Sequence, residues 1–165
     1  MKMELIQPFI NSADAVLAEM LRCTTQIGDM TMEEETYRRK GVAAVVVVNG
    51  DIEGRVIFDI DAETATRIAS TLAGQQVAQS NQIVSETMCE LANLVIGNAV
   101  TSLNDQGFRF KIHPPHMHGD DEGLKGNEDT EALVMYFETP VGNVYMNIAM
   151  RYNRRRRGEE LAAAV

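Results

Sequence analysis

The sequence lacks any long apolar run. None of its segments reaches the roughly 18 consecutive apolar residues that a membrane-spanning helix needs. Residues 1–8 also lack the apolar stretch and the small-residue cleavage site of a secretory signal. We therefore expect a cytoplasmic protein.

Positive charge is scarce as well. The chain has 15 Lys and Arg residues against 24 Asp and Glu residues, which gives a formal net charge of −9. Binding to a nucleic-acid backbone depends on clustered positive charge that releases counterions, and an anionic membrane surface makes a similar demand. We expect neither nucleic acid nor a membrane as a partner.

Cysteine is limited to two residues, Cys23 and Cys89. They are far apart in the sequence and neither belongs to a C-x-x-C pair, so the spacing does not predict a metal or redox motif. Both fall in apolar helical patterns, and we expect buried free thiols.

The length and composition indicate one globular domain. The chain has 165 residues, of which 45% are hydrophobic and 24% are charged. We assign residues 1–153 to this domain. Residues 154–165 begin with four arginines and continue with two glutamates, and we expect them to form a solvated, disordered tail.

Sequence patterns predict a mixed α/β (α+β) fold. Helices are expected at residues 8–23, 61–73 and 81–104, and strands at residues 42–48, 52–60, 108–113, 132–138 and 144–152. Pro8 is expected in a first helical turn, Asn49-Gly50 in a hairpin turn, and Gly74 after a helix end. Residues 24–40 are weakly patterned and residues 116–130 read as an exposed loop. Helix followed by hairpin occurs once in each half, although the two halves show no residue-level repeat.

The helix at residues 81–104 carries the strongest functional signal. Its apolar residues gather on one side and are expected to pack on the sheet: Val84, Met88, Leu91, Val95 and Ala99. On the opposite side, spaced four, three and four apart, are Glu86, Glu90, Asn93 and Gly97. A solvated face of any amphipathic helix has such a stripe, so the spacing alone does not identify a site.

The longer stretch SETMCELANLVIGNA at residues 85–99 resembles the catalytic helix of the CheC/CheX/FliY phosphatases, in which Glu-Leu-x-Asn is followed by an apolar segment and Gly-Asn-Ala. The segments IQPFINSA at residues 6–13 and VNGDIEG at residues 48–54 resemble the opening helix and first hairpin of that family. The resemblance covers roughly residues 3–150. Only the family's later proline is matched approximately, by Pro114 and Pro115.

The resemblance implies a CheC-like two-layer fold, with a mostly antiparallel sheet and the long helices on one face. It implies a phosphatase for the phosphoaspartate of a CheY-type response regulator, with Mg²⁺ held by the regulator and no cofactor or metal in this chain. Asn93 would position the attacking water and Glu90 would pair with a regulator lysine, while Glu86 and Gly97 would contact the partner. The resemblance also implies a homodimer.

The double-site members of this family carry Glu-x-x-Asn on both related helices. In the opening helix of this chain, Glu19 is followed three residues later by Arg22 instead. We therefore expect one site per chain, as in the CheX branch.

Two other functions fit parts of the sequence. A non-catalytic module would use the same helix to bind and sequester a phosphorylated receiver domain. A metal-responsive protein would use the His-rich segment at residues 113–121, whose ligand types are His113, His116, His118, Asp120 and Asp121. A polar loop is the favoured interpretation of this segment. A nucleotide-dependent enzyme or a serine hydrolase is not indicated, because the sequence has neither a Gly-rich phosphate loop nor a G-x-S-x-G motif.

Overall fold

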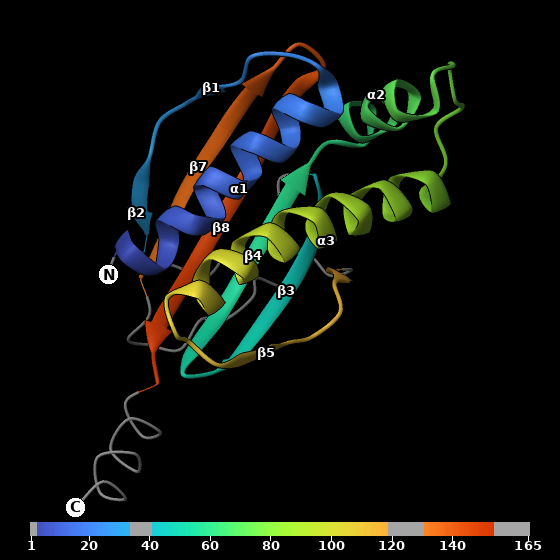
Figure 1. The fold of residues 1–165 in the computed structure, drawn as a ribbon. Helices are drawn as coiled ribbons and strands as arrows, with labels where there is room; N and C mark the ends of the chain where they lie inside the picture. Colours follow the sequence, from blue (N-terminus) through green and yellow to red (C-terminus); the bar gives the residue numbers. More distant parts are fainter. Residues whose placement is uncertain (1–2, 34–40, 119–130, 154–165) are drawn as a thin grey trace, which may run out of the picture.

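The structure, a computed structural model, describes residues 3–33, 41–118 and 131–153. In these ranges an eight-stranded antiparallel sheet is covered on one face by two long helices, and a shorter helix lies at one end (Figure 1). The helices are α1 (Met3–Leu21), α2 (Ala62–Ala73) and α3 (Asn81–Asp105). The strands are β1 (Gln26–Ile27), β2 (Thr31–Glu33), β3 (Val42–Gly50), β4 (Ile52–Ile60), β5 (Phe110–Ile112), β6 (His116–His118), β7 (Ala132–Thr139) and β8 (Gly142–Tyr152). The expected fold class is confirmed.

The sheet is built from two similar halves that exchange short strands. Its order is β1-β7-β8-β4-β3-β5, with β2 also beside β7 and β6 also beside β3. Each half consists of a long helix, two short strands and a hairpin, in that order. The short strands of each half pair with the outer hairpin strand of the other half: β1 and β2 lie beside β7, and β5 and β6 lie beside β3. The helix-plus-hairpin pattern of the sequence therefore corresponds to a two-fold arrangement around the β4–β8 pair.

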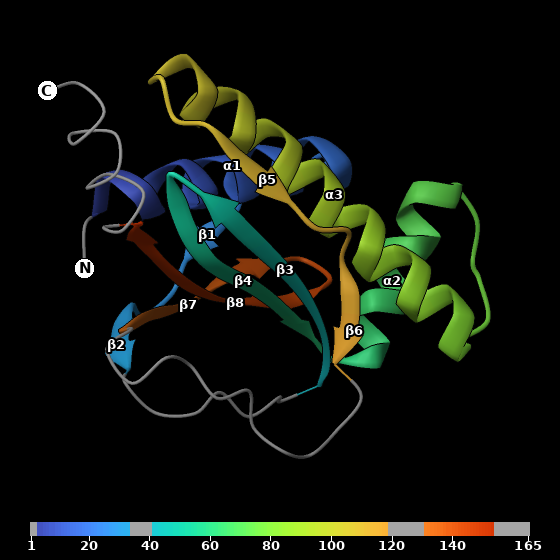
Figure 2. The same cartoon turned by 90° about the horizontal axis from the view of Figure 1, so that it is seen from below.

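The main core lies between this sheet and the long helices, as the view from below shows (Figure 2). Alternate residues of the hairpin strands point into it, including Val46, Phe58 and Met146, each at most 1% exposed. The β3–β4 turn is tight because Gly50 adopts a φ of 148°, which a residue with a side chain rarely adopts. The predicted Asn49-Gly50 turn is confirmed in place, with Asn49 still paired in β3.

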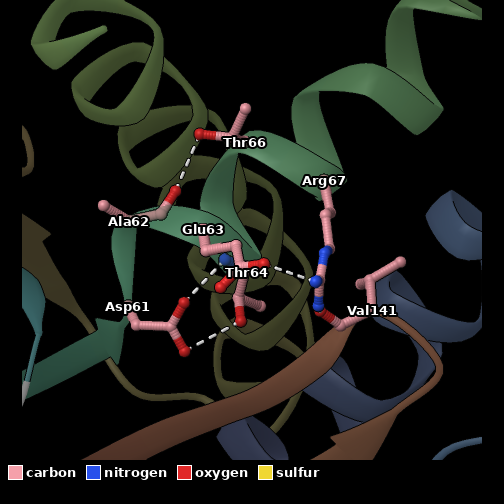
Figure 3. A network of polar contacts seen from close by, with 7 residues as sticks. All are labelled: Asp61, Ala62, Glu63, Thr64, Thr66, Arg67 and Val141. Carbon is pink, nitrogen blue, oxygen red and sulfur yellow. Dashed lines mark hydrogen bonds and ion pairs between the residues drawn. The ribbon is translucent and has the colours of Figure 1, made fainter. Parts of the chain in front are cut away.

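The start of α2 is fixed by a polar cap (Figure 3). The Asp61 carboxylate accepts hydrogen bonds from the Thr64 backbone N–H at 2.7 Å and from the Thr64 hydroxyl at 2.9 Å. One helical turn later, the Arg67 guanidinium donates a hydrogen bond at 3.4 Å to the carbonyl of Val141. Val141 lies in the turn between β7 and β8. Gly74 ends the helix in the left-handed conformation, as predicted.

Several expectations from the sequence were wrong in detail. α1 begins at Met3, so Pro8 lies inside the helix and not in its first turn. Residues 116–118 were expected in a loop but form β6 against β3. The weakly patterned residues 24–33 contribute β1 and β2, for which the sequence made no prediction. The expected loop from 119 onward and the tail at 154–165 lie outside the described residues.

The two thiols are free as expected, but Cys23 and Cys89 are only partly buried. In the described part of the chain, no helix is long and apolar enough to span a membrane.

Candidate functional site

Helix α3 is long and lies beside α1 on one face of the sheet (Figure 1). It begins where the Ser80 hydroxyl accepts a hydrogen bond from the Ile83 N–H at 3.1 Å. The five residues predicted to face the core are all buried: Val84, Met88, Leu91, Val95 and Ala99. The apolar stripe therefore faces the sheet, as predicted, and the opposite side of the helix faces solvent.

The inner side of α3 is also held by a polar contact that the sequence did not reveal. The buried Ser12 hydroxyl of α1 donates to the Val95 carbonyl of α3 at 2.5 Å. This bond lies within one helical turn of Asn93, on the other side of the helix. A short hydroxyl-bearing residue permits a close approach of the two helices at this point, and the bond fixes the position of α3 relative to α1.

The predicted polar stripe is a single exposed face. Glu86, Glu90, Asn93 and Gly97 are all exposed. Glu86 accepts a hydrogen bond from the Gln82 side chain at 3.0 Å. Among the residues that the structure describes, Glu90 and Asn93 have no hydrogen-bond or ion-pair partner. At a spacing of i and i+3 their Cβ atoms lie about 5 to 6 Å apart, so a carboxylate and a carboxamide are presented together to solvent.

Helix α3 carries acidic residues and no basic ones. Residues 81–105 include Glu86, Glu90 and Asp105 but no Lys, Arg or His. A partner with a single basic side chain would therefore meet no competing cation on this helix.

Gly97 leaves an open position one turn beyond Asn93. A Cβ atom built on Gly97 would have no described atom within 4 Å other than its chain neighbours and the backbone of its own helix, so the packing around it does not require a glycine. Glycine in an exposed helix interior costs about 0.5–1 kcal/mol relative to alanine. The glycine at position 97 therefore lowers helix stability, and it leaves open space on the stripe at the same place.

The stripe is convex rather than a pocket. A groove of about 490 Å³ runs between α1 and α3, and a hollow of about 330 Å³ lies beside the β3–β4 turn, but neither is lined by a stripe residue. Small molecules usually bind in concave sites that enclose most of their surface. An exposed helix face suits a macromolecular partner better.

The His-rich segment does not form a metal site in the part that the structure describes. The His113 Nε2 atom lies 2.9 Å from the Asn49 side-chain nitrogen, and His116 belongs to β6. No group of three or more His, Cys, Asp or Glu residues gathers among the described residues. Asp120 and Asp121 lie outside them.

The fold matches that of known proteins. A solved CheC-like superfamily protein from Shewanella sp. PV-4 superposes with a TM-score of 0.80 at 22% identity, covering 92% of this chain and 99% of that one. A chain of the solved CheX–CheY–BeF3–Mg complex from Borrelia burgdorferi superposes with a TM-score of 0.72 at 34% identity, covering 88% of this chain and 97% of that one.

Sequence comparison points to the same group. The "CheY-P phosphatase CheX" of Thermotoga maritima is 22% identical over 116 residues, which are 70% of this chain and 75% of that protein. The family model described as "Chemotaxis phosphatase CheX" matches residues 42–138, more than half of the 165 residues and inclusive of the whole polar stripe. The chain therefore belongs to the CheX family of chemotaxis phosphatases.

Proposed function

We propose that this protein is a phosphatase that accelerates hydrolysis of the phosphoaspartate of a CheY-type response regulator. The observation that carries the proposal is the exposed Glu90–Asn93 pair, which has no hydrogen-bond or ion-pair partner among the described residues. The name of the Thermotoga maritima relative and the CheX–CheY complex from Borrelia burgdorferi support a receiver domain as the partner.

The reaction asks little covalent chemistry of this chain. A phosphoaspartate is an activated acyl phosphate, so catalysis depends on placing a water molecule in line with the phosphorus. The water oxygen bonds to phosphorus, the bond from phosphorus to the aspartate oxygen breaks, and the products are a free aspartate and inorganic phosphate. A nucleophilic side chain of this protein is not needed.

Asn93 is assigned the positioning of that water. The carboxamide oxygen accepts a hydrogen bond and the NH₂ group donates one, and neither changes charge near neutral pH. Because Asn93 is exposed on a convex helix, it can enter the active site of a docked receiver. Since no residue in the described part of the chain bonds it, both of its polar atoms are available there.

Glu90 is assigned the anchoring of the complex through an ion pair with a receiver lysine. The absence of any cation in residues 81–105 leaves its charge uncompensated on its own helix. Glu86, one turn earlier, is assigned a peripheral contact because Gln82 already bonds its carboxylate. Gly97 is assigned the close approach of the partner.

Mg²⁺ belongs to the receiver domain in this proposal. The metal would neutralise charge on the transferred phosphoryl group, and this chain would supply the amide and the anchoring carboxylate. We therefore expect the dependence of the reaction on Mg²⁺ to follow the metal affinity of the receiver.

We also propose that two copies of the chain associate. The edge formed by β1 and β2 exposes the large apolar side chains of Ile27, Met30 and Met32, between 43% and 49% of each residue. An exposed sheet edge of this kind can be covered by the same edge of a second copy around a two-fold axis. Light scattering at several concentrations tests this, and a monomer mass throughout would contradict it.

The function is tested by phosphate release from a phosphorylated receiver domain. Wild type is compared with Asn93→Ala and Glu90→Ala at a series of receiver concentrations. Faster release with wild type alone would support the phosphatase and both assigned roles. Binding of the phosphorylated receiver without faster release would instead support a module that sequesters it, because both functions use the same helix face.

A further inference from the structure

Leu94 is an apolar side chain exposed within the polar face of α3. It is 41% exposed, whereas every other large apolar residue of α3 is buried or half-buried. At 100° per residue, Leu94 lies about 40° from Glu90 around the helix and about 60° from Gly97. The side chain therefore belongs to the same surface as the proposed anchor and not to the core stripe.

The Leu94 side chain projects from the helix surface, and Gly97, which has no side chain, leaves open space beside it. They are neighbours at i and i+3, which places them on the same part of the helix surface. Apart from Gly97's own helix backbone and its two chain neighbours, no described atom lies within 4 Å of a Cβ position on Gly97. A partner surface can reach the helix backbone at Gly97 and enclose the exposed Leu94 side chain from that side.

Leu94 is an exposed apolar side chain beside polar ones, an arrangement found at the centres of protein interfaces. Protein interfaces concentrate binding energy in a few central contacts that polar groups surround. The polar neighbour of Leu94 on the surface of α3 is Glu90, four residues earlier, which has no partner among the described residues. A matching partner would present an apolar side chain next to the lysine that pairs with Glu90.

We propose that Leu94 is the apolar anchor of the receiver-docking face and that Gly97 provides the gap beside it. This inference rests on the proposed function. The occupant is the receiver domain because Leu94 lies within one helical turn of both Glu90 and Asn93, on the surface that the receiver must cover for Asn93 to reach the phosphoaspartate. Leu94 acts on docking and does not touch the reacting atoms.

The chain offers a matched control. Leu72 on α2 is 46% exposed, close to the value for Leu94, and lies outside the stripe. The experiment compares wild type, Leu94→Gln, Leu94→Met and Leu72→Gln. For each, calorimetry measures the affinity for a receiver loaded with beryllium fluoride and Mg²⁺, and phosphate release measures the maximal rate at saturating phosphorylated receiver.

We expect Leu94→Gln to weaken receiver binding about tenfold or more and to leave the maximal rate unchanged. Leu94→Met should keep most of the affinity, because it restores an apolar side chain of similar size. Leu72→Gln should bind as wild type does. Since both leucines are exposed, thermal unfolding should be the same for all four proteins.

Equal affinity of Leu94→Gln and wild type would overturn the inference while leaving the phosphatase intact if wild type accelerates release. A different outcome is that Leu94→Gln is the only variant to lose receiver binding while wild type does not accelerate phosphate release. That result would support the docking role of Leu94 and contradict the phosphatase function. A change of oligomeric mass in Leu94→Gln, with receiver affinity unchanged, would assign Leu94 to self-association and overturn the inference. No receiver binding by wild type would overturn both.

Discussion

Glu90 and Asn93 stand one helical turn apart on the exposed face of α3, and neither has a hydrogen-bond or ion-pair partner among the described residues. The preceding pair on the same face behaves differently, because Gln82 donates to Glu86 at 3.0 Å. An internal bond uses polar atoms that a partner would otherwise contact. The free pair combines a charged anchor with a neutral amide, so binding and water positioning can be removed separately by substitution.

The first prediction concerns Asn93→Ala. We expect the acceleration of phosphate release to fall by about 100-fold or more, because a positioned polar group is lost from the transition state. Receiver affinity should change little, since Glu90 and the rest of the face remain. Asn104→Ala, which removes an exposed carboxamide eleven residues further along α3, should release phosphate as wild type does. Undiminished turnover by Asn93→Ala would contradict the assignment.

The second prediction concerns Glu90→Lys. Placing like charges together at the interface should cost about 2–5 kcal/mol of binding free energy, measured by titration calorimetry. Glu86→Lys should cost less than about 1 kcal/mol, because an exposed rim charge contributes little. Glu19→Lys, on α1, makes the same charge change on the other long helix and serves as the control. Normal receiver affinity of Glu90→Lys would exclude an anchoring role.

The sequence predicted α3 and its two faces because long amphipathic helices carry a strong periodic signal. Gly74 was also a local signal, and the structure confirms it as the end of α2. The exposure of Leu94 was not predicted, although a helical wheel places it about 40° from Glu90, on the polar side of the helix. An apolar residue outside the core stripe is the signal that would have found it.

Other features depended on contacts between distant segments. Pro8 interrupts the hydrogen bonds of α1 and would usually mark a helix start, but Leu5 and Ile6 before it are fully buried. Their burial on the sheet favours helix on both sides of the proline. The short strands β1, β2 and β6 exist because β7 and β3 offer them an edge, and two or three residues carry no readable pattern of their own.

The third prediction concerns the cap of α2. Asp61→Ala removes the acceptor for both the Thr64 N–H and the Thr64 hydroxyl, and we expect the free energy of unfolding to fall by about 1–2 kcal/mol. Urea denaturation measures this. Glu63→Ala removes the exposed ion pair with Arg67 and should cost less than about 1 kcal/mol. An unchanged denaturation midpoint for Asp61→Ala would show that the cap contributes nothing.

The last prediction separates stability from docking at Gly97. Gly97→Ala should raise the free energy of unfolding by about 0.5–1 kcal/mol, because alanine favours helix and no described side chain or neighbouring element lies within 4 Å of the new methyl group. Receiver affinity should nevertheless fall, since the methyl group fills the space proposed for the partner. Calorimetry and urea denaturation of the same preparation measure the two effects.

Gly142→Ala provides the opposite case. Gly142 has a φ of 136°, and its Cβ would lie 2.2 Å from the Thr64 hydroxyl oxygen, so this substitution should lower stability without touching the stripe. If Gly97→Ala both stabilises the protein and binds the receiver as tightly as wild type, the glycine has no role in docking. If Gly97→Ala stabilises the protein and weakens receiver binding, the role of Gly97 in docking accounts for a glycine that lowers the stability of α3.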